Sequence, residues 1–159
     1  MLLMDSAYSV VENALDKLMK SKAISDKEKA KYLSITAAVS GQNNNVRVKW
    51  LEHAYKLNEG NKSRELHQAS LTNLISANYE FRTRVAAGGA LNRLGICNQE
   101  IVNHLIDAVL TYNSRLAGPC AGYLKNMSKK SENLEMINKS IEGLNDEQKE
   151  ILKQYGVIK

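Results

Sequence analysis

Three histidines are the residues of this chain best suited to metal binding or acid–base chemistry. They are His53, His67 and His104, and they stand far apart in the sequence. Zinc enzymes hold their ion with short patterns such as His-Glu-x-x-His, which places two ligands on one face of a helix. No such pattern occurs here. We therefore expect neither a metal nor another cofactor in this chain.

Two of these histidines have different expected surroundings. On a helix, His67 would share its face with leucines and an isoleucine, which favours a partly buried structural histidine over a metal ligand. His104 would lie between Glu100 and Asp107 on a polar face. Those carboxylates could raise the pKa of His104 and create a pH-sensitive patch. A merely solvated polar face is the simpler interpretation.

Residues that could act as nucleophiles also lack the patterns of known catalytic sites. Cys97 and Cys120 are 23 residues apart and form no Cys-x-x-Cys pair, so we expect two reduced, apolar side chains. The chain has no Gly-x-Ser-x-Gly elbow and no Gly-rich phosphate loop. The pair Gly88-Gly89 is expected inside a helix. We therefore expect no enzyme active site within this chain.

Five basic residues recur near the expected starts of three successive helices. They are Arg47, Lys49, Arg82, Arg84 and Arg115. If the helices stack, these residues form a ladder on a concave face that could hold a carboxylate, a phosphate or an acidic partner. The alternative is a structural role, in which they bond to carbonyl groups and side chains of the neighbouring repeat. Positive charge at a helix N-terminus opposes the helix dipole, which indicates that these residues have partners.

A repeat near 34 residues organises the elements that would position these side chains. Four helix-like segments close with a leucine, at Leu15, Leu57, Leu91 and Leu124, with spacings of 42, 34 and 33 residues. Such a period is typical of an α-solenoid. The clearest copy, Phe81 to Gly95, resembles the second helix of a HEAT repeat. We predict an all-α fold, an α-solenoid of HEAT/ARM-like antiparallel helix pairs with about nine helices and no strands.

Capping residues mark most of the expected helix boundaries. Ser25 to Glu28 and Asn145 to Gln148 are capping boxes, and Asn78, Asn98 and Asn113 are further candidate N-caps. Pro119 is expected to kink or start its helix. The expected helices cover residues 5–19, 26–39, 46–58, 63–77, 79–94, 99–112, 114–127, 131–144 and 146–155, with Ser63 as the N-cap of the fourth and with Gly41, Gly60 and Gly156 as stops.

Length and charge limit the classes of partner. The chain has 159 residues and a net charge of +5, with lysines spread along it rather than gathered in a run. It has no charge block typical of a nucleic-acid arm and no apolar stretch long enough to span a bilayer. We expect a single helical repeat domain over residues 1–159 that binds neither nucleic acid nor a membrane.

The first expected helix lacks a preceding helix that would cover its apolar side. That side carries Tyr8, Val10, Val11 and Leu15. Terminal repeats of a solenoid normally have a polar outer face. We therefore expect these four residues to form an interdomain edge, and the chain to be a fragment of a larger protein.

Several stretches together resemble a known family. Asp5 to Leu15, Val46 to Glu52, Tyr79 to Arg84 and Arg115 to Pro119 are similar to the HEAT-like C-terminal region of bacterial zinc aminopeptidases of the alanyl aminopeptidase and leukotriene hydrolase type. The resemblance covers residues 5–127. It implies a non-catalytic helical-repeat domain that packs on the catalytic domain and walls its peptide chamber.

The same resemblance assigns no catalytic role to this chain. In that family the zinc ligands and a Gly-Ala-Met-Glu-Asn-type motif belong to the catalytic domain, and neither motif occurs here. The zinc would therefore reside in the parent protein. The alternative is a free-standing HEAT/ARM-like scaffold that binds a protein or peptide on its concave face. A basic solenoid that reads phosphates would need more interleaved aromatic residues than this sequence has.

Overall fold

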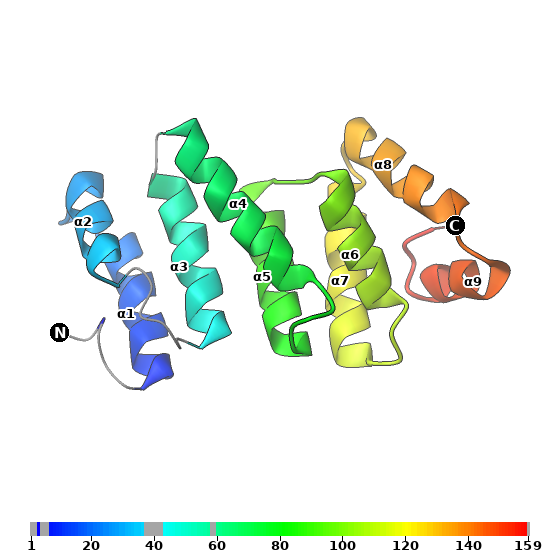
Figure 1. The fold of residues 1–159 in the computed structure, drawn as a ribbon, viewed down its shortest axis with the longest axis horizontal. Helices are drawn as coiled ribbons and strands as arrows, with labels where there is room; N and C mark the ends of the chain where they lie inside the picture. Colours follow the sequence, from blue (N-terminus) through cyan, green and yellow to red (C-terminus); the bar gives the residue numbers. More distant parts are fainter. Residues whose placement is uncertain (1–2, 4–6, 37–42, 58–59, 159) are drawn as a thin grey trace. The chain divides into compact units, whose positions relative to one another are not determined.

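The structure, a computed structural model, describes residue 3 and residues 7–36, 43–57 and 60–158. These residues form nine α-helices and no β-strand, which confirms the predicted all-α class (Figure 1). The helices are α1 (Tyr8–Lys20), α2 (Asp26–Thr36), α3 (Asn44–Leu57), α4 (Asn61–Ile75), α5 (Phe81–Leu94), α6 (Gln99–Val109), α7 (Ser114–Met127), α8 (Ser131–Glu142) and α9 (Asp146–Gln154).

The internal contacts of the chain define two compact units. Unit 1 is Met1–Leu71 and unit 2 is Thr72–Lys159, so the boundary falls within α4. In unit 1, α3 packs against both α1 and α2. In unit 2, α7 packs against α5, α6 and α8, and α6 also packs against α8. Helices thus meet their nearest and next-nearest neighbours in the chain, as in helical-repeat proteins.

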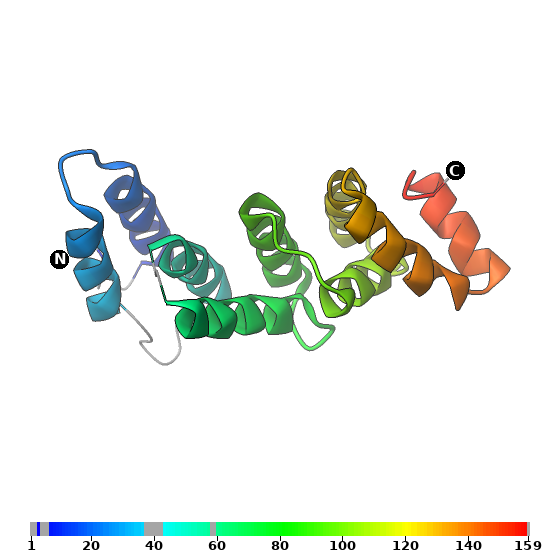
Figure 2. The same cartoon turned by 90° about the horizontal axis from the view of Figure 1, so that it is seen from above.

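Helices α5 and α7 of unit 2 run in the same direction, and α6, which comes between them in the sequence, runs in the opposite direction (Figure 1, and from above in Figure 2). The N-terminal ends of α5 and α7 therefore lie at one edge of unit 2. Their C-terminal ends lie at the opposite edge. Only side chains at the same edge of unit 2 are therefore close enough to contact one ligand.

Apolar side chains from four segments form the core of unit 1. Its buried members are contributed by the segment before α1 and by α1, α2 and α3, and half-buried residues such as Trp50 pack around them. The buried members are Leu3, Val11, Leu15, Leu33, Val46 and Ala54. Helix α1 is thus covered by the helices that follow it in the sequence.

Two adjacent glycines allow α5 and α7 to approach closely. A Cβ atom at Gly88 would lie 3.1 Å from Cδ2 of Tyr123, and one at Gly89 would lie 2.9 Å from the Tyr123 hydroxyl oxygen. The side chain of Leu105, on α6, would come within 3.2 Å of the same Gly88 atom. The close packing of α5 expected from this glycine pair is confirmed.

The strongest capping signals in the sequence are confirmed. The side chain of Asn98 accepts a hydrogen bond from the backbone N–H of Ile101, and Asn113 and Asn145 cap α7 and α9 in the same way. Asn145 also completes its capping box with Gln148. Each of these side chains satisfies a backbone donor that the first turn of a helix leaves without a partner.

Other helix boundaries differ from the prediction. Helix α5 begins at Phe81 after Glu80, so Asn78 is not its cap, because the N–H of Tyr79 bonds to the carbonyl of Ser76 in a turn. Ser63 lies inside α4, which begins at Asn61. The prediction was wrong at both positions. The expected ends at Val39, Gly41 and Asn58 lie outside the described residues.

Two further predictions concern Pro119 and Gly156. Pro119 lies within α7 rather than at its start. Gly156 follows the last helix with a φ of 68°, a left-handed conformation that glycine adopts without strain, and so matches the predicted stop.

Candidate functional site

Two exposed arginines stand at the same edge of unit 2. Arg82 is the second residue of α5 and Arg115 is the second residue of α7. Because α5 and α7 are parallel neighbours, both residues lie at the edge of unit 2 where these helices begin. Neither guanidinium forms a hydrogen bond or ion pair with a described residue, although that of Arg82 lies 5.7 Å above the ring of Phe81. Their donors are therefore available to a partner.

An aromatic side chain extends from the same edge. Tyr112, in the turn between α6 and α7, is 97% exposed. We use the term arginine edge for Arg82, Tyr112 and Arg115. The N-terminal ends of two helices add partial positive charge there. The acidic neighbour Glu80 accepts a hydrogen bond from the hydroxyl of Thr83 at 3.4 Å.

Arg84, two residues beyond Arg82, is buried and belongs to the interior of unit 2. Its side chain is only 5% exposed, and its Nε–H donates to the backbone carbonyl of Ile75 at 2.7 Å. The sequence offered a structural role as the alternative for the five basic residues, in which they bond to carbonyl groups of neighbouring helices. Arg84 forms a bond of this kind. Burial raises the pKa of the nearby Cys120 thiol to about 11, and the charge of Arg84 opposes that rise. Cys120 is therefore a protonated, apolar thiol at neutral pH.

The remaining two basic residues belong to unit 1. Arg47 is exposed, whereas the ammonium of Lys49 lies 2.9 Å from a carboxylate oxygen of Asp16. Burial alone would raise the pKa of the Asp16 carboxyl. The hydrogen bond and charge of Lys49, together with a smaller contribution from His53, outweigh that effect, so the pKa of Asp16 lies below its usual value. Lys49 is thus engaged within unit 1.

His53 lies beside this pair in a buried position on α3. Its Nε2 is 3.5 Å from the second carboxylate oxygen of Asp16, which is too long for a well-formed hydrogen bond. Burial lowers the pKa of His53, and the adjacent Glu52 only partly opposes this. His53 is therefore neutral at pH 7. The described contacts of His53 include no nucleophile. We therefore interpret His53, Asp16 and Lys49 as a structural cluster.

The expected apolar edge of α1 is largely covered. Val11 is 3% exposed and Leu15 is fully buried, because both lie in the core of unit 1. The expectation of an uncovered side is corrected for these two residues, since Leu3 and side chains of α2 and α3 pack with them in that core. Tyr8, at 48% exposure, and the half-buried Val10 are the members that remain accessible.

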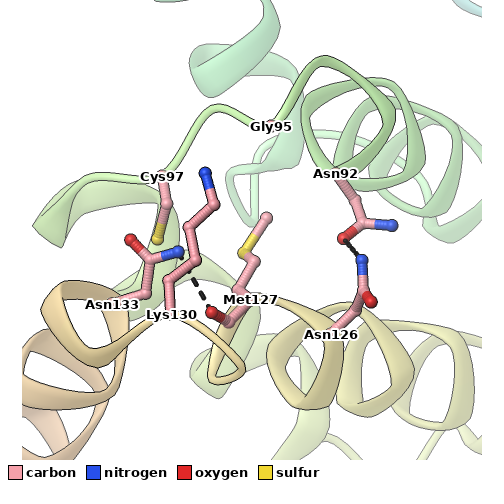
Figure 3. A pocket seen from close by; sticks show the side chains of 7 residues that line it. All are labelled: Asn92, Gly95, Cys97, Asn126, Met127, Lys130 and Asn133. Carbon is pink, nitrogen blue, oxygen red and sulfur yellow. Dashed lines mark hydrogen bonds between the residues drawn. The ribbon is translucent and has the colours of Figure 1, made fainter.

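A small pocket lies at the opposite edge of unit 2, where α5 and α7 end (Figure 3). Its volume is about 60 Å³, enough for a few water molecules. The amide of Asn126 donates to the side-chain oxygen of Asn92 at 2.9 Å, and that of Asn133 donates to the carbonyl of Met127 at 3.0 Å. Burial raises the pKa of the Cys97 thiol, which also lines this pocket. The thiol is therefore a weak nucleophile at neutral pH.

A larger pocket lies in unit 1 among α2, α3 and α4. Its volume is about 300 Å³. It is lined by Ala30, Leu33, Ser34, Trp50, Ala54, Leu57, Ser63 and His67. Sequence reasoning missed this pocket, because its walls come from three helices whose relative positions depend on packing. The sequence does contain one usable signal. Trp50, the chain's only tryptophan, lies on the helix before the one in which His67 shares a partly apolar face.

Within the described ranges, no three His, Cys, Asp or Glu side chains gather closely enough to hold a metal ion. No described helix combines the length and apolar character needed to cross a bilayer. Comparisons with models of protein families, with curated proteins and with solved structures found no match for this chain.

Proposed function

We propose that this chain is a non-catalytic helical-repeat module that binds an acidic segment of another protein or a peptide. The observation that carries the proposal is the pair Arg82 and Arg115, two exposed guanidiniums at the parallel N-terminal ends of α5 and α7. Neither forms an ion pair or hydrogen bond with a described residue. A guanidinium presents a planar set of donors that matches a carboxylate.

The stacking of α5 and α7 sets the spacing that a partner must match. Neighbouring helix axes are about 8–10 Å apart in packed helical proteins. Two to three residues of an extended chain span that distance. A segment with two acidic residues at such a spacing can therefore engage Arg82 and Arg115 together, while Tyr112 offers apolar contact beside them.

The resemblance to zinc aminopeptidases specifies one form of this function. In that form, the bound segment belongs to the catalytic domain of the parent protein or to a peptide in its chamber. The free-standing scaffold is the other form, with a separate protein as the partner. In both forms the chain itself supplies no zinc ligand and no catalytic residue. Metal-dependent hydrolysis of an aminoacyl anilide by the purified chain would refute both.

Binding of labelled acidic peptides tests the proposal. Fluorescence anisotropy would compare a peptide with two Glu residues, spaced by one or two residues, with its Gln counterpart. We expect the Glu peptide alone to bind, with an affinity that falls as salt is added. The double variant Arg82→Gln/Arg115→Gln should lose about tenfold or more in affinity.

The control variant is Lys139→Gln, which removes an exposed positive charge from α8 of the same unit. It should bind the Glu peptide as the unaltered chain does. Equal affinity of the double arginine variant and the Lys139→Gln variant would show that net charge, rather than the arginine edge, attracts the peptide. That result would overturn the proposal.

A further inference from the structure

The pocket of unit 1 has the size and lining of a site for an apolar group. Its floor and walls include Leu33, Ala54 and Leu57, and Ala30 stands exposed on α2 at its margin. A volume of about 300 Å³ lies at the lower end of the range of ligand pockets and accommodates one large side chain such as Phe or Leu. Ser34 and Ser63 place hydroxyl groups among the lining residues.

One wall of this pocket is held in place by interactions within unit 1. The indole N–H of Trp50 donates to the backbone carbonyl of Leu33 at 3.0 Å. The rings of Trp50 and His67 meet edge to face, with centroids 5.5 Å apart. A wall that is already ordered adds little entropic cost when a ligand binds.

The pocket interior carries no positive charge at neutral pH. Burial lowers the pKa of His67, the only ionisable residue in its lining, so that the imidazole is neutral at pH 7. An apolar group can therefore enter without burying an unpaired charge beside it.

Three lysines stand close in the sequence to residues that line the pocket. Lys27 and Lys31 lie three residues before and one residue after Ala30 on α2, and Lys62 precedes Ser63 on α4. All three lysines are exposed, and none forms an ion pair or side-chain hydrogen bond with a described residue.

The acidic residues of the same helices do not neutralise these three lysines. Asp26 pairs with Lys29 at 3.0 Å. The carboxylate of Glu28 is held by Ser25 in the capping box of α2. Glu65 stands two positions after Ser63, which is about 200° around the helix and thus on the opposite face of α4. Glu28 keeps its negative charge, but Lys27, Lys31 and Lys62 together outnumber it, so the net charge beside the pocket is positive.

We propose that this pocket binds one large apolar side chain of an acidic, amphipathic peptide segment, whose carboxylates contact Lys27, Lys31 and Lys62. The apolar lining selects the anchor, and the positive margin selects acidic residues on either side of it. This site lies within unit 1 and is independent of the arginine edge of unit 2. It gives the module a second, chemically different contact for a protein partner.

Trp50 is the only tryptophan of the chain and lines the pocket, so its fluorescence reports occupancy. The probe is a synthetic helical peptide without tryptophan that carries one Phe with Glu residues one turn before and after it. We expect a saturable change in Trp50 emission, and a binding at least about tenfold weaker when the Phe is replaced by Ala. Anionic lipid vesicles are the comparison probe.

Filling the pocket tests the site directly. Ala30→Phe places a ring in the pocket from an exposed position, and Ala23→Phe adds the same ring to an exposed position outside the lining. We expect only Ala30→Phe to lose about tenfold or more in affinity, with the helical circular dichroism of both variants unchanged. Lys27→Gln/Lys31→Gln should weaken binding and flatten its salt dependence.

Three results would overturn this proposal. The first is equal binding by Ala30→Phe and Ala23→Phe. The second is an unchanged affinity when the peptide loses its Phe. The third is a Trp50 response to the vesicles but not to the peptide, which would assign the pocket to a lipid surface instead. The variant Arg82→Gln/Arg115→Gln should retain the Trp50 response, so that failure at one surface is distinguishable from failure at the other.

Discussion

The hydroxyl of Tyr123 donates a hydrogen bond to the backbone carbonyl of Val85 at 3.2 Å, across the contact of α7 with α5. The bond is possible because the tyrosine ring lies over Gly88 and Gly89, where a side chain on α5 would displace it. Two glycines inside a helix cost about 1 kcal/mol each relative to alanine. Close packing against α7 offsets this cost, and the hydrogen bond fixes the position of the ring.

Replacing either glycine of this pair with leucine should destabilise the protein. We expect Gly88→Leu and Gly89→Leu each to lower the free energy of unfolding by about 1–3 kcal/mol through overpacking against Tyr123. Chemical denaturation would measure the change. The control is Gly122→Ala in α7, where no atom lies within 4 Å of the added Cβ. That variant should gain about 0.5–1 kcal/mol from better helix propensity. Leucine variants as stable as the unaltered chain would contradict the packing of α5.

Loss of the buried arginine should also destabilise unit 2. Arg84→Ala leaves the carbonyl of Ile75 without its donor and opens a space beside Cys120. We expect a cost of about 1–3 kcal/mol in the free energy of unfolding. Arg82→Ala, on the exposed face of the same helix turn, should change stability by less than about 0.5 kcal/mol. Similar effects of the two substitutions in thermal or chemical unfolding would show that Arg84 is not structurally engaged.

The buried state of His53 predicts a pH dependence of stability. Because its pKa in the folded protein lies below the unfolded value of 6.5, the unfolded chain takes up a proton before the folded chain does. Stability attributable to His53 is therefore present above pH 6.5 and declines as the pH falls from there toward the folded pKa. We expect His53→Gln to flatten this decline, as measured by urea unfolding between pH 7 and pH 5.

Two neighbours define the control for that measurement. His67, whose pKa burial also lowers, contributes a decline of the same sign, so the double variant with His67→Gln should be flatter still. The pKa of Asp16 is lowered from 3.8, so its contribution is lost only below that pH. A slope between pH 7 and pH 5 that neither histidine substitution alters would mean that both rings are solvated.

The capping box of α9 gives a prediction about the C-terminal helix. Asn145→Ala removes the side chain that accepts from the N–H of Gln148 at 2.9 Å. We expect a loss of about 1 kcal/mol in the free energy of unfolding. Asn78→Ala is the matched control, because Asn78 has the residue type of a cap but does not cap α5. Equal losses in the two variants would argue against the cap as the cause.

The helices could be predicted from the sequence because their signals are local. Asn98, Asn113 and Asn145 each act within their own first turn, so the residue type and its position sufficed. The same reasoning failed at Asn78, where a turn that includes Tyr79 takes up the chain before α5 begins. Local propensity does not reveal such competition between two nearby structures.

The candidate sites could be predicted only in part, because they depend on packing between helices. Arg82 and Arg84 are two residues apart and look alike in the sequence, but only Arg84 faces the interior of unit 2. The sequence predicts that Val11 and Leu15 lie uncovered on α1. Side chains of α2 and α3, which follow it, cover them instead. Burial of this kind depends on the three-dimensional arrangement and not on order along the chain.

The neighbour-to-neighbour packing of α5, α6, α7 and α8 has a consequence for how unit 2 acquires its structure. Each helix meets partners that are one or two helices away in the chain, so only short loops must close before a contact forms. Proteins dominated by such local contacts fold quickly, and repeats of this kind can nucleate at one pair and extend to the next. During synthesis, we therefore expect α5 and α6 to be joined when α7 emerges, because α7 packs against both of them and its Tyr123 ring lies over Gly88 and Gly89.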